Sequence, residues 1–130
     1  MNEQMPKSIE WIMQQDGRYP AAAAYFVQEG LQYTVEQFFP NLPAGQSQHV
    51  TGQQLCLGLH DLALHRWGLM ARYALRHWNI NYTRDFGEII YILIGGGWLN
   101  KQENDGIDDF NDAYNFDESF EYSISVPKRI

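Results

Sequence analysis

The chain has 130 residues, the usual size of one domain, and this length argues against a multidomain assembly. Hydrophobic residues make up 45% of the sequence and charged residues 19%, a composition far too apolar for a disordered tail. Nine Lys and Arg against sixteen Asp and Glu give a net charge of -7, so nucleic acid is a disfavoured partner.

Two helices are predicted in the first 39 residues. The first covers residues 6–15, because Pro6 suits a first helical position and Asp16-Gly17 is a stop signal. The second begins at Tyr19-Pro20, runs to about residue 39, and has apolar residues three and four apart. Prolines and polar residues predict a loop at 40–50 that links two helical halves.

The next segment predicts two more helices. A capping box formed by Thr51 and Gln54 predicts that a helix begins there and ends before Gly68. The helix after it, at residues 69–78, has two apolar faces, and the pattern does not choose which one is buried. One face has Met70, Tyr73, Ala74 and His77, and the other has Ala71, Leu75 and Trp78.

A further helix is expected to be capped by Thr83 and to carry its apolar residues on one side. These residues are Phe86, Ile89, Ile90 and Leu93. The helix is expected to close at the three glycines of residues 95–97. The glycines follow a helix and lack the Lys-Ser or Lys-Thr pair of a phosphate-binding loop, so they are interpreted as a helix end.

The C-terminal part has a different pattern. Residues 98–102 are compatible with a short strand, residues 104–106 with a turn, and residues 120–126 alternate with period two, which predicts a small β-hairpin. Residues 103–121 contain eight of the sixteen acidic residues. Because this segment also has aromatic residues that could pin it to a core, it is expected to form an acidic flap.

The expected fold is therefore mainly α. It is a compact bundle of about five helices with a small C-terminal β-hairpin, and its second half has a winged-helix-like order. We expect one domain over residues 1–130, with a helical half at 1–39, a linker at 40–50, and a second helical half with the acidic hairpin at 51–130.

The sequence contains a weak internal similarity at a constant offset of 66 residues, which would imply two similar helical halves. Arg18, Tyr25, Phe26, Val27 and Gly30 match Arg84, Tyr91, Ile92, Leu93 and Gly96.

Three stretches carry longer motifs: Tyr19-Pro20 followed by residues 25–34, then four segments at 49–56, 61–64, 67–72 and 83–90, and finally the acidic residues 108–117. Together they resemble an uncharacterised family of small bacterial repeat proteins from planctomycetes and verrucomicrobia. The chain departs from that family in its glycine run and after Phe120. The resemblance implies no activity, ligand or catalytic residue.

The sequence favours a cytoplasmic location. Its one cysteine, Cys56, cannot form an internal disulfide, which is typical of a reducing compartment. The first seven residues lack the basic start and apolar run of a signal peptide. The most apolar stretch, residues 86–99, is shorter than the roughly 20 residues of a membrane span, so no membrane contact is expected.

Two metal patterns are incomplete, and no metal or cofactor is expected. Cys56 and His60 are four residues apart on one helical face, but His65 is rotated away from them, and two ligands do not make a site. Glu103, Asp105, Gly106 and Asp112 match positions of a calcium-binding EF-hand loop, whose first position is then Lys101. A lysine there repels the cation.

No residues of a recognisable catalytic mechanism are present, and the chain is not expected to be an enzyme. Asp61 and His65 are one helical step apart, but no serine or reactive cysteine accompanies them in an obvious role. Such a pair more often stabilises a helix.

The favoured function is a non-enzymatic protein-interaction module with an unidentified protein partner. The candidate partner-binding residues are Arg66, Trp67, Arg72, Arg76 and Arg84, because Arg and Trp are enriched at binding hot spots. The competing interpretation is that these arginines pair with Asp108, Asp109 and Asp112 of the same chain. A second copy could also pack on the apolar residues 89–94, which would make a homo-oligomer. The alternative function is a winged-helix-like DNA-binding or transcription-associated protein.

Overall fold

The structure, a computed structural model, describes residues 7–43, 49–101 and 106–125, with side chains to residue 120. These ranges contain six α-helices and two short 3-10 helices. The α-helices are α1 (Ile9–Asp16), α2 (Ala21–Phe38), α3 (Gly52–Trp67), α4 (Ala71–His77), α5 (Thr83–Gly95) and α6 (Phe116–Ser125). The 3-10 helices are η2 (Gly68–Met70) and η3 (Ile107–Phe110). The prediction of a mainly helical fold is confirmed.

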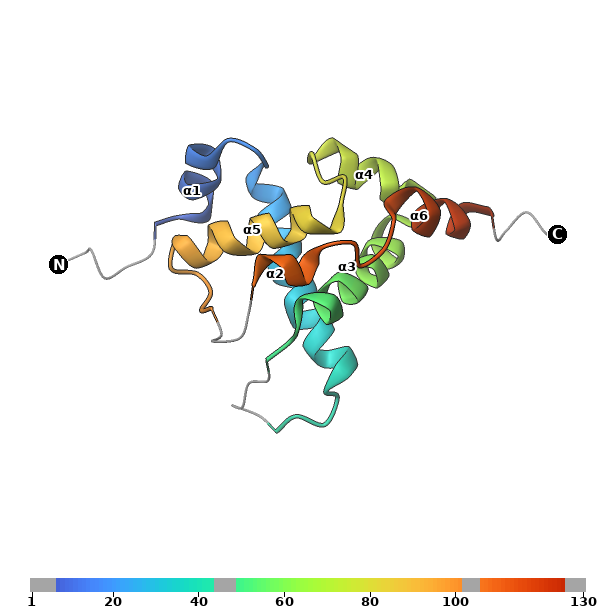
Figure 1. The fold of residues 1–130 in the computed structure, drawn as a ribbon, viewed down its shortest axis with the longest axis horizontal. Helices are drawn as coiled ribbons and strands as arrows, with labels where there is room; N and C mark the ends of the chain where they lie inside the picture. Colours follow the sequence, from blue (N-terminus) through green and yellow to red (C-terminus); the bar gives the residue numbers. More distant parts are fainter. Residues whose placement is uncertain (1–6, 44–48, 102–105, 126–130) are drawn as a thin grey trace.

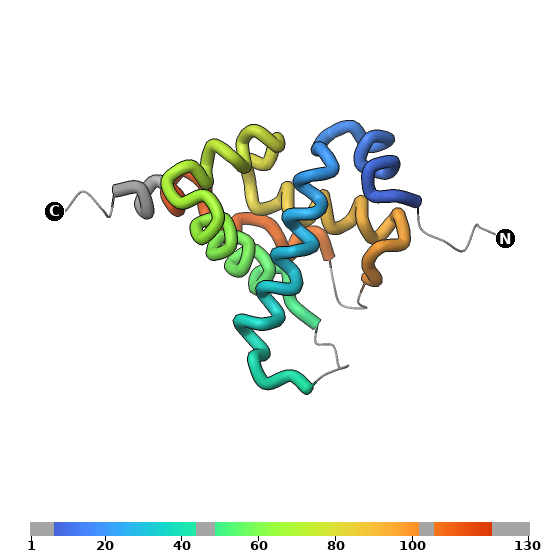
Figure 2. Tube along the Cα trace, turned by 180° about the vertical axis from the view of Figure 1, so that it is seen from behind, coloured from blue at the N-terminus to red at the C-terminus, as the bar shows by residue number. Residues whose placement is uncertain are grey.

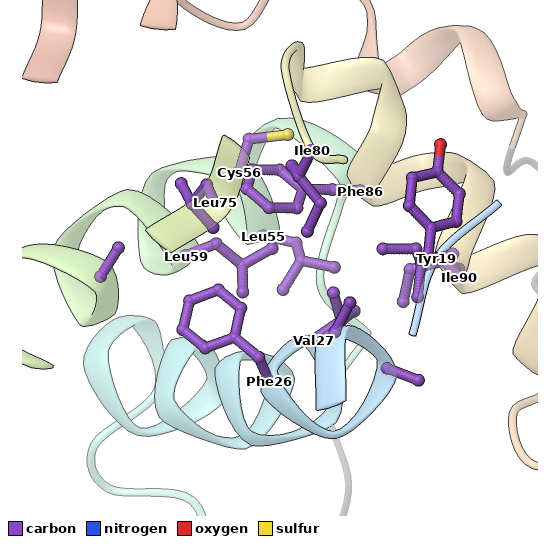
Figure 3. Close-up of a cluster of buried hydrophobic side chains, with 14 of the residues drawn as sticks. Tyr19, Phe26, Val27, Leu55, Cys56, Leu59, Leu75, Ile80, Phe86 and Ile90 are labelled. Atoms are coloured by element: carbon purple, nitrogen blue, oxygen red, sulfur yellow. The ribbon is translucent and has the colours of Figure 1, made fainter. Parts of the chain in front are cut away.

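The core lies where α2, α3 and α5 meet. Helix α2 runs across α5 and beside α3, and α1 folds back against α2 and α5 (Figures 1 and 2). Figure 3 shows apolar side chains of α2, α3 and α5 pointing toward one another, with those of α4 and the 78–82 turn closing the top. The fully buried residues there include Phe26, Val27, Leu59, Leu75, Ile80 and Phe86. Because buried residues from Ile9 to Phe120 join one cluster, both helical halves share this core.

Glycines allow α2 and α3 to pack closely. A Cβ atom on Gly58 of α3 would overlap the hydroxyl of Thr34 on α2 and lie 2.8 Å from the Thr34 Cβ. A Cβ atom on Gly30 of α2 would in turn overlap Leu59 of α3. The Thr34 hydroxyl donates to the Gly30 carbonyl at 2.6 Å, which satisfies this buried polar group within its own helix. Each helix thus supplies one glycine to the contact.

The starts of α1 and α3 follow local capping signals. Ser8 caps α1 by accepting from the Trp11 amide at 3.0 Å, so the helix starts at Ile9, three residues after the position expected from Pro6. The capping box of Thr51 and Gln54 at the start of α3 is confirmed, with both hydrogen bonds present.

The start of α5 differs from the prediction. Thr83 is not its cap. The Asp85 carboxylate accepts hydrogen bonds from the backbone amides of Asn81 and Tyr82 at 2.8 and 3.0 Å, so it satisfies the free N–H groups where the helix begins. Thr83 is buried, and its hydroxyl donates to the Phe110 carbonyl at 2.5 Å. It therefore ties η3 to α5. The helix closes at the glycine run as predicted, with Gly97 in the left-handed region at φ 87°.

The predicted C-terminal β-hairpin is wrong for the residues that can be described. Residues 98–101 form no strand, and the alternating segment from residue 120 belongs to α6. The Asn115 side chain accepts from the Glu118 amide at 3.0 Å, a helix-capping bond, and Phe116 and Phe120, four apart, are both buried on one face. Gln102 and Val126, the remaining ends of the two expected strands, lie outside the described residues. Without a hairpin, the winged-helix-like order has no support.

Candidate interaction surface

Arg66 and Trp67 lie at the end of α3 against α2. The Arg66 guanidinium forms an ion pair with Glu29 and lies 5.8 Å from the ring centres of Phe26 and Trp67. The Trp67 ring is half-buried, 5.1 Å from Phe26 and 5.4 Å from Trp78. Both residues therefore join α2 to α3, which leaves only part of each side chain for a partner.

Arg72 connects α4 to α6. Its side chain is only 15% exposed, its Nε lies 3.2 Å from the Asp117 carboxylate, and its guanidinium lies 5.6 Å from the centre of the Phe116 ring. Its Nη1 is buried and has no hydrogen-bond partner among the described residues. Arg72 thus holds α6 in place.

Arg84 on α5 faces the acidic segment. It lies 3.2 Å from Glu88, 3.0 Å from Asp108, and 2.9 Å from the Asn111 side-chain oxygen. Hydrogen bonds to Asp108 and then Glu88 raise the pKa of its guanidinium. The acidic segment therefore pairs with Arg84 through Asp108 but leaves the Arg84 side chain 43% exposed. The Asp109 carbonyl accepts instead from the Gln53 side chain at 2.7 Å.

Arg76 has different surroundings from the other three. It lies 5.7 Å from the centre of the Tyr73 ring, and no carboxylate in the described ranges pairs with it. Leu69, Met70 and Tyr73 beside it are 52%, 57% and 55% exposed. His77, which follows Arg76 in the chain, is also exposed. We call these five residues, Leu69, Met70, Tyr73, Arg76 and His77, the outer α4 face.

The burial of α4 explains this surface. Of the two apolar faces predicted for residues 69–78, the structure buries the one with Ala71 and Leu75, and Trp78 is half-buried beside them. In a helix, residues 69, 73 and 76 lie opposite residues 71, 75 and 78. Helix α4 lies at the edge of the molecule in Figure 1, so its second apolar face is left at the surface.

His60 and Cys56 on α3 do not form a metal site. The His60 Nε2 lies 2.8 Å from the Ser119 hydroxyl of α6, and its ring packs against Tyr114 and Phe120 with centres 5.1 and 4.7 Å away. Burial lowers the pKa of His60, against smaller opposite effects of Ser119 and Asp61. Burial raises the pKa of the Cys56 thiol to about 12, which keeps it protonated and unreactive. No three His, Cys, Asp or Glu side chains converge as metal ligands within residues 7–43, 49–101 and 106–120.

Asp61 and His65 gain a third partner that the sequence did not indicate. The Tyr33 hydroxyl of α2 donates to the Asp61 carboxylate, a bond that raises the pKa of Tyr33. The Tyr33 hydroxyl also lies 3.4 Å from the Nδ1 atom of His65, and this Nδ1 atom is 3.1 Å from the Asp61 carbonyl oxygen. The three residues link α2 to α3 at the surface. The contact required α2 to be placed, so no local signal could have revealed it.

The cavities that border α5 include two of different character. One of about 420 Å³ is mostly apolar and lies between α2, the start of α3, α5 and η3, with Leu31, Val35, Ile94 and Leu99 in its wall. The other, of about 860 Å³, is lined by Arg18, Arg72 and Arg84, but also by Asp85, Glu88, Asp112 and Asp117. Because these opposite charges offset one another, the second cavity has no excess positive charge to attract an anion.

The expected oligomer contact, the calcium-loop residues and the possibility of a membrane span can also be compared with the structure. Ile89 and Leu93 of the proposed oligomer contact are fully buried in the chain's own core, and Ile92 and Ile94 are half-buried. Of the calcium-loop residues, Glu103 and Asp105 lie outside the described residues. Among the helices that are described, none is both long and apolar enough to span a bilayer.

Comparison with protein-family models, with curated proteins and with solved structures finds no match to this chain. The resemblance to the planctomycete and verrucomicrobial family, and the internal similarity at 66 residues, therefore stay predictions from sequence motifs.

Proposed function

We propose that this chain is a non-enzymatic, cytoplasmic protein-interaction module that binds its partner through the outer α4 face. One observation carries the proposal. Helix α4 and the adjoining η2 have apolar side chains on two opposite sides, and the fold buries only the side with Ala71 and Leu75. Exposed apolar groups that form a contiguous patch, instead of being scattered singly, are typical of interaction sites.

The residue types of this face also favour binding. Tyr, Met and Arg are enriched at protein interfaces, and Tyr and Arg are frequent hot spots. The Arg76 guanidinium over the Tyr73 ring presents an aromatic and a cationic group together. Arg66 and Trp67 come directly before η2 in the chain, and we place them at the border of the proposed surface. Arg72 supports it by holding α6, and Arg84 is not part of it.

Site-specific photo-cross-linking tests the proposal. A benzophenone amino acid replaces Met70 in one variant and Tyr82 in the control, because Tyr82 is 72% exposed at the start of α5 and is not part of the outer α4 face. We expect a discrete adduct with one other protein in native cells from position 70 and none from position 82.

A second substitution makes the result specific. Adding Tyr73→Ser to the cross-linking variant removes a central aromatic group, and we expect the adduct to fall at least about fivefold, the effect of losing about 1 kcal/mol of binding energy. Equal adducts at positions 70 and 82, or an adduct that survives Tyr73→Ser, would contradict the proposal.

A further inference from the structure

The outer α4 face has a distinct charge as well as exposed apolar groups. Residues 65–77 contain three Arg and two His but no Asp or Glu, in a chain whose net charge is -7. Arg66 and Arg72 of this segment are paired with Glu29 and Asp117. Arg76 has no carboxylate partner in the described ranges, so its charge is available to a partner.

The geometry of the face suits a helix. Leu69, Tyr73 and Arg76 are spaced by four and three residues, so they form a ridge along one side of η2 and α4. From residue 69 to residue 76 this ridge is about 11 Å long, at about 2.0 Å per residue in η2 and 1.5 Å per residue in α4. A helix of two to three turns that lies along it can place apolar residues at i, i+3 or i+4, and i+7 against Leu69, Met70 and Tyr73.

Two other occupants fit less well. A second copy that used the same face in a two-fold dimer would bring Arg76 against a surface without Asp or Glu at residues 65–77, so the Arg76 charge would be left without a carboxylate partner. A membrane with anionic lipids would repel the rest of a chain with a net charge of -7. A protein segment that supplies its own carboxylates meets neither obstacle.

We infer that the partner presents an acidic amphipathic helix, whose apolar side covers Leu69, Met70 and Tyr73 while its carboxylates pair with Arg76. This inference rests on the proposed function of the outer α4 face. It adds the chemistry of the partner: Asp or Glu flanking an apolar stripe of helical period.

A peptide-display selection on the full chain tests this inference. The probe is a library of 16-residue helix-forming peptides, randomised at six positions on one side. We expect the enriched peptides to carry large apolar residues at i, i+3 or i+4, and i+7, with Asp or Glu beside them. Binding of an enriched peptide is expected to weaken about tenfold with Arg76→Glu and to weaken in higher salt.

Controls separate charge from folding. Lys7→Glu makes the same change in net charge at an exposed residue next to α1, and we expect it to leave peptide binding unchanged. Tyr73→Ser is expected to abolish binding while far-UV circular dichroism keeps the wild-type spectrum.

The outcomes distinguish the inference from the proposed function. Enriched peptides that require Tyr73 but are neutral or basic, and that ignore Arg76→Glu, would overturn the acidic helix and leave the proposed function standing. Absence of any peptide that depends on Tyr73 would also overturn the inference, and cross-linking at position 70 then decides the proposed function separately. Binding to phosphatidylserine vesicles, or a dimer in sedimentation, that is lost with Tyr73→Ser would identify a membrane or a second copy as the occupant and overturn the inference.

Discussion

Substituting alanine for Gly58 tests the close contact that brings α2 and α3 together. The new Cβ atom would overlap the Thr34 hydroxyl and lie 2.8 Å from the Thr34 Cβ. Thr34 cannot move aside easily, because its side chain is fully buried and its hydroxyl is bonded to the Gly30 carbonyl. The two helices must therefore separate locally.

The expected magnitude combines two opposing effects. Overpacking of a tight core costs about 1–3 kcal/mol. Replacing a glycine inside a helix by alanine returns about 1 kcal/mol through helix propensity. Because the overlap at Gly58 involves the Thr34 Cβ, whose position follows the backbone, we expect the upper part of the cost and a net loss of about 1–2 kcal/mol in the free energy of unfolding.

Urea unfolding followed by circular dichroism measures this change. Gly95→Ala is the matched control, since nothing lies within 4 Å of its Cβ position at the end of α5. It has the helix-propensity effect without the overlap, so its stability is expected to equal that of wild type or to rise by up to about 1 kcal/mol. Thr34→Ala removes the hydroxyl and methyl groups that crowd position 58, so the Gly58→Ala/Thr34→Ala double variant is expected to lose less stability than the sum of the single variants. A Gly58→Ala protein as stable as wild type, or strictly additive changes, would refute the close contact.

Three further predictions follow from the described contacts. Burial lowers the pKa of His60, so below about pH 6.5 the unfolded chain binds the proton first. The free energy of unfolding therefore decreases as the pH falls toward the folded-state pKa of His60. His60→Gln is expected to flatten this pH dependence, and an unchanged difference between urea titrations at pH 7.5 and pH 5.5 would contradict the prediction. Because burial raises the pKa of Cys56 to about 12, we expect a thiol reagent at pH 8 to react far more slowly with the native chain than with the urea-unfolded chain, and equal rates would show that the thiol is accessible. The net charge of -7 and the ion pair of Arg84 with Asp108 predict no retarded band in a low-salt DNA mobility shift, and a shift that Arg84→Ala removes would support the DNA-binding alternative instead.

Local signals predicted those parts of the fold that depend on neighbouring residues alone. The capping box at Thr51 and Gln54 was found correctly because both partners lie within one helical turn. Gly17 ends α1 with φ 84°, a conformation that glycine adopts readily. The error at α6 arose because residues 120–126 alternate with period two, although the capping signal of Asn115 and the four-residue spacing of Phe116 and Phe120 were present in the sequence.

The candidate surface could be predicted only in part. The sequence by itself determined a mainly helical chain, the lack of acidic residues at 65–77, and a helix with two apolar faces. Only the tertiary structure decided which face α4 buries, and that Arg72 and Arg84 pair with Asp117 and Asp108 while Arg76 does not. The physical reason is that burial and ion pairing depend on segments far apart in the chain, such as residues 72 and 117, whose distance is set by packing of the whole core and not by helix period.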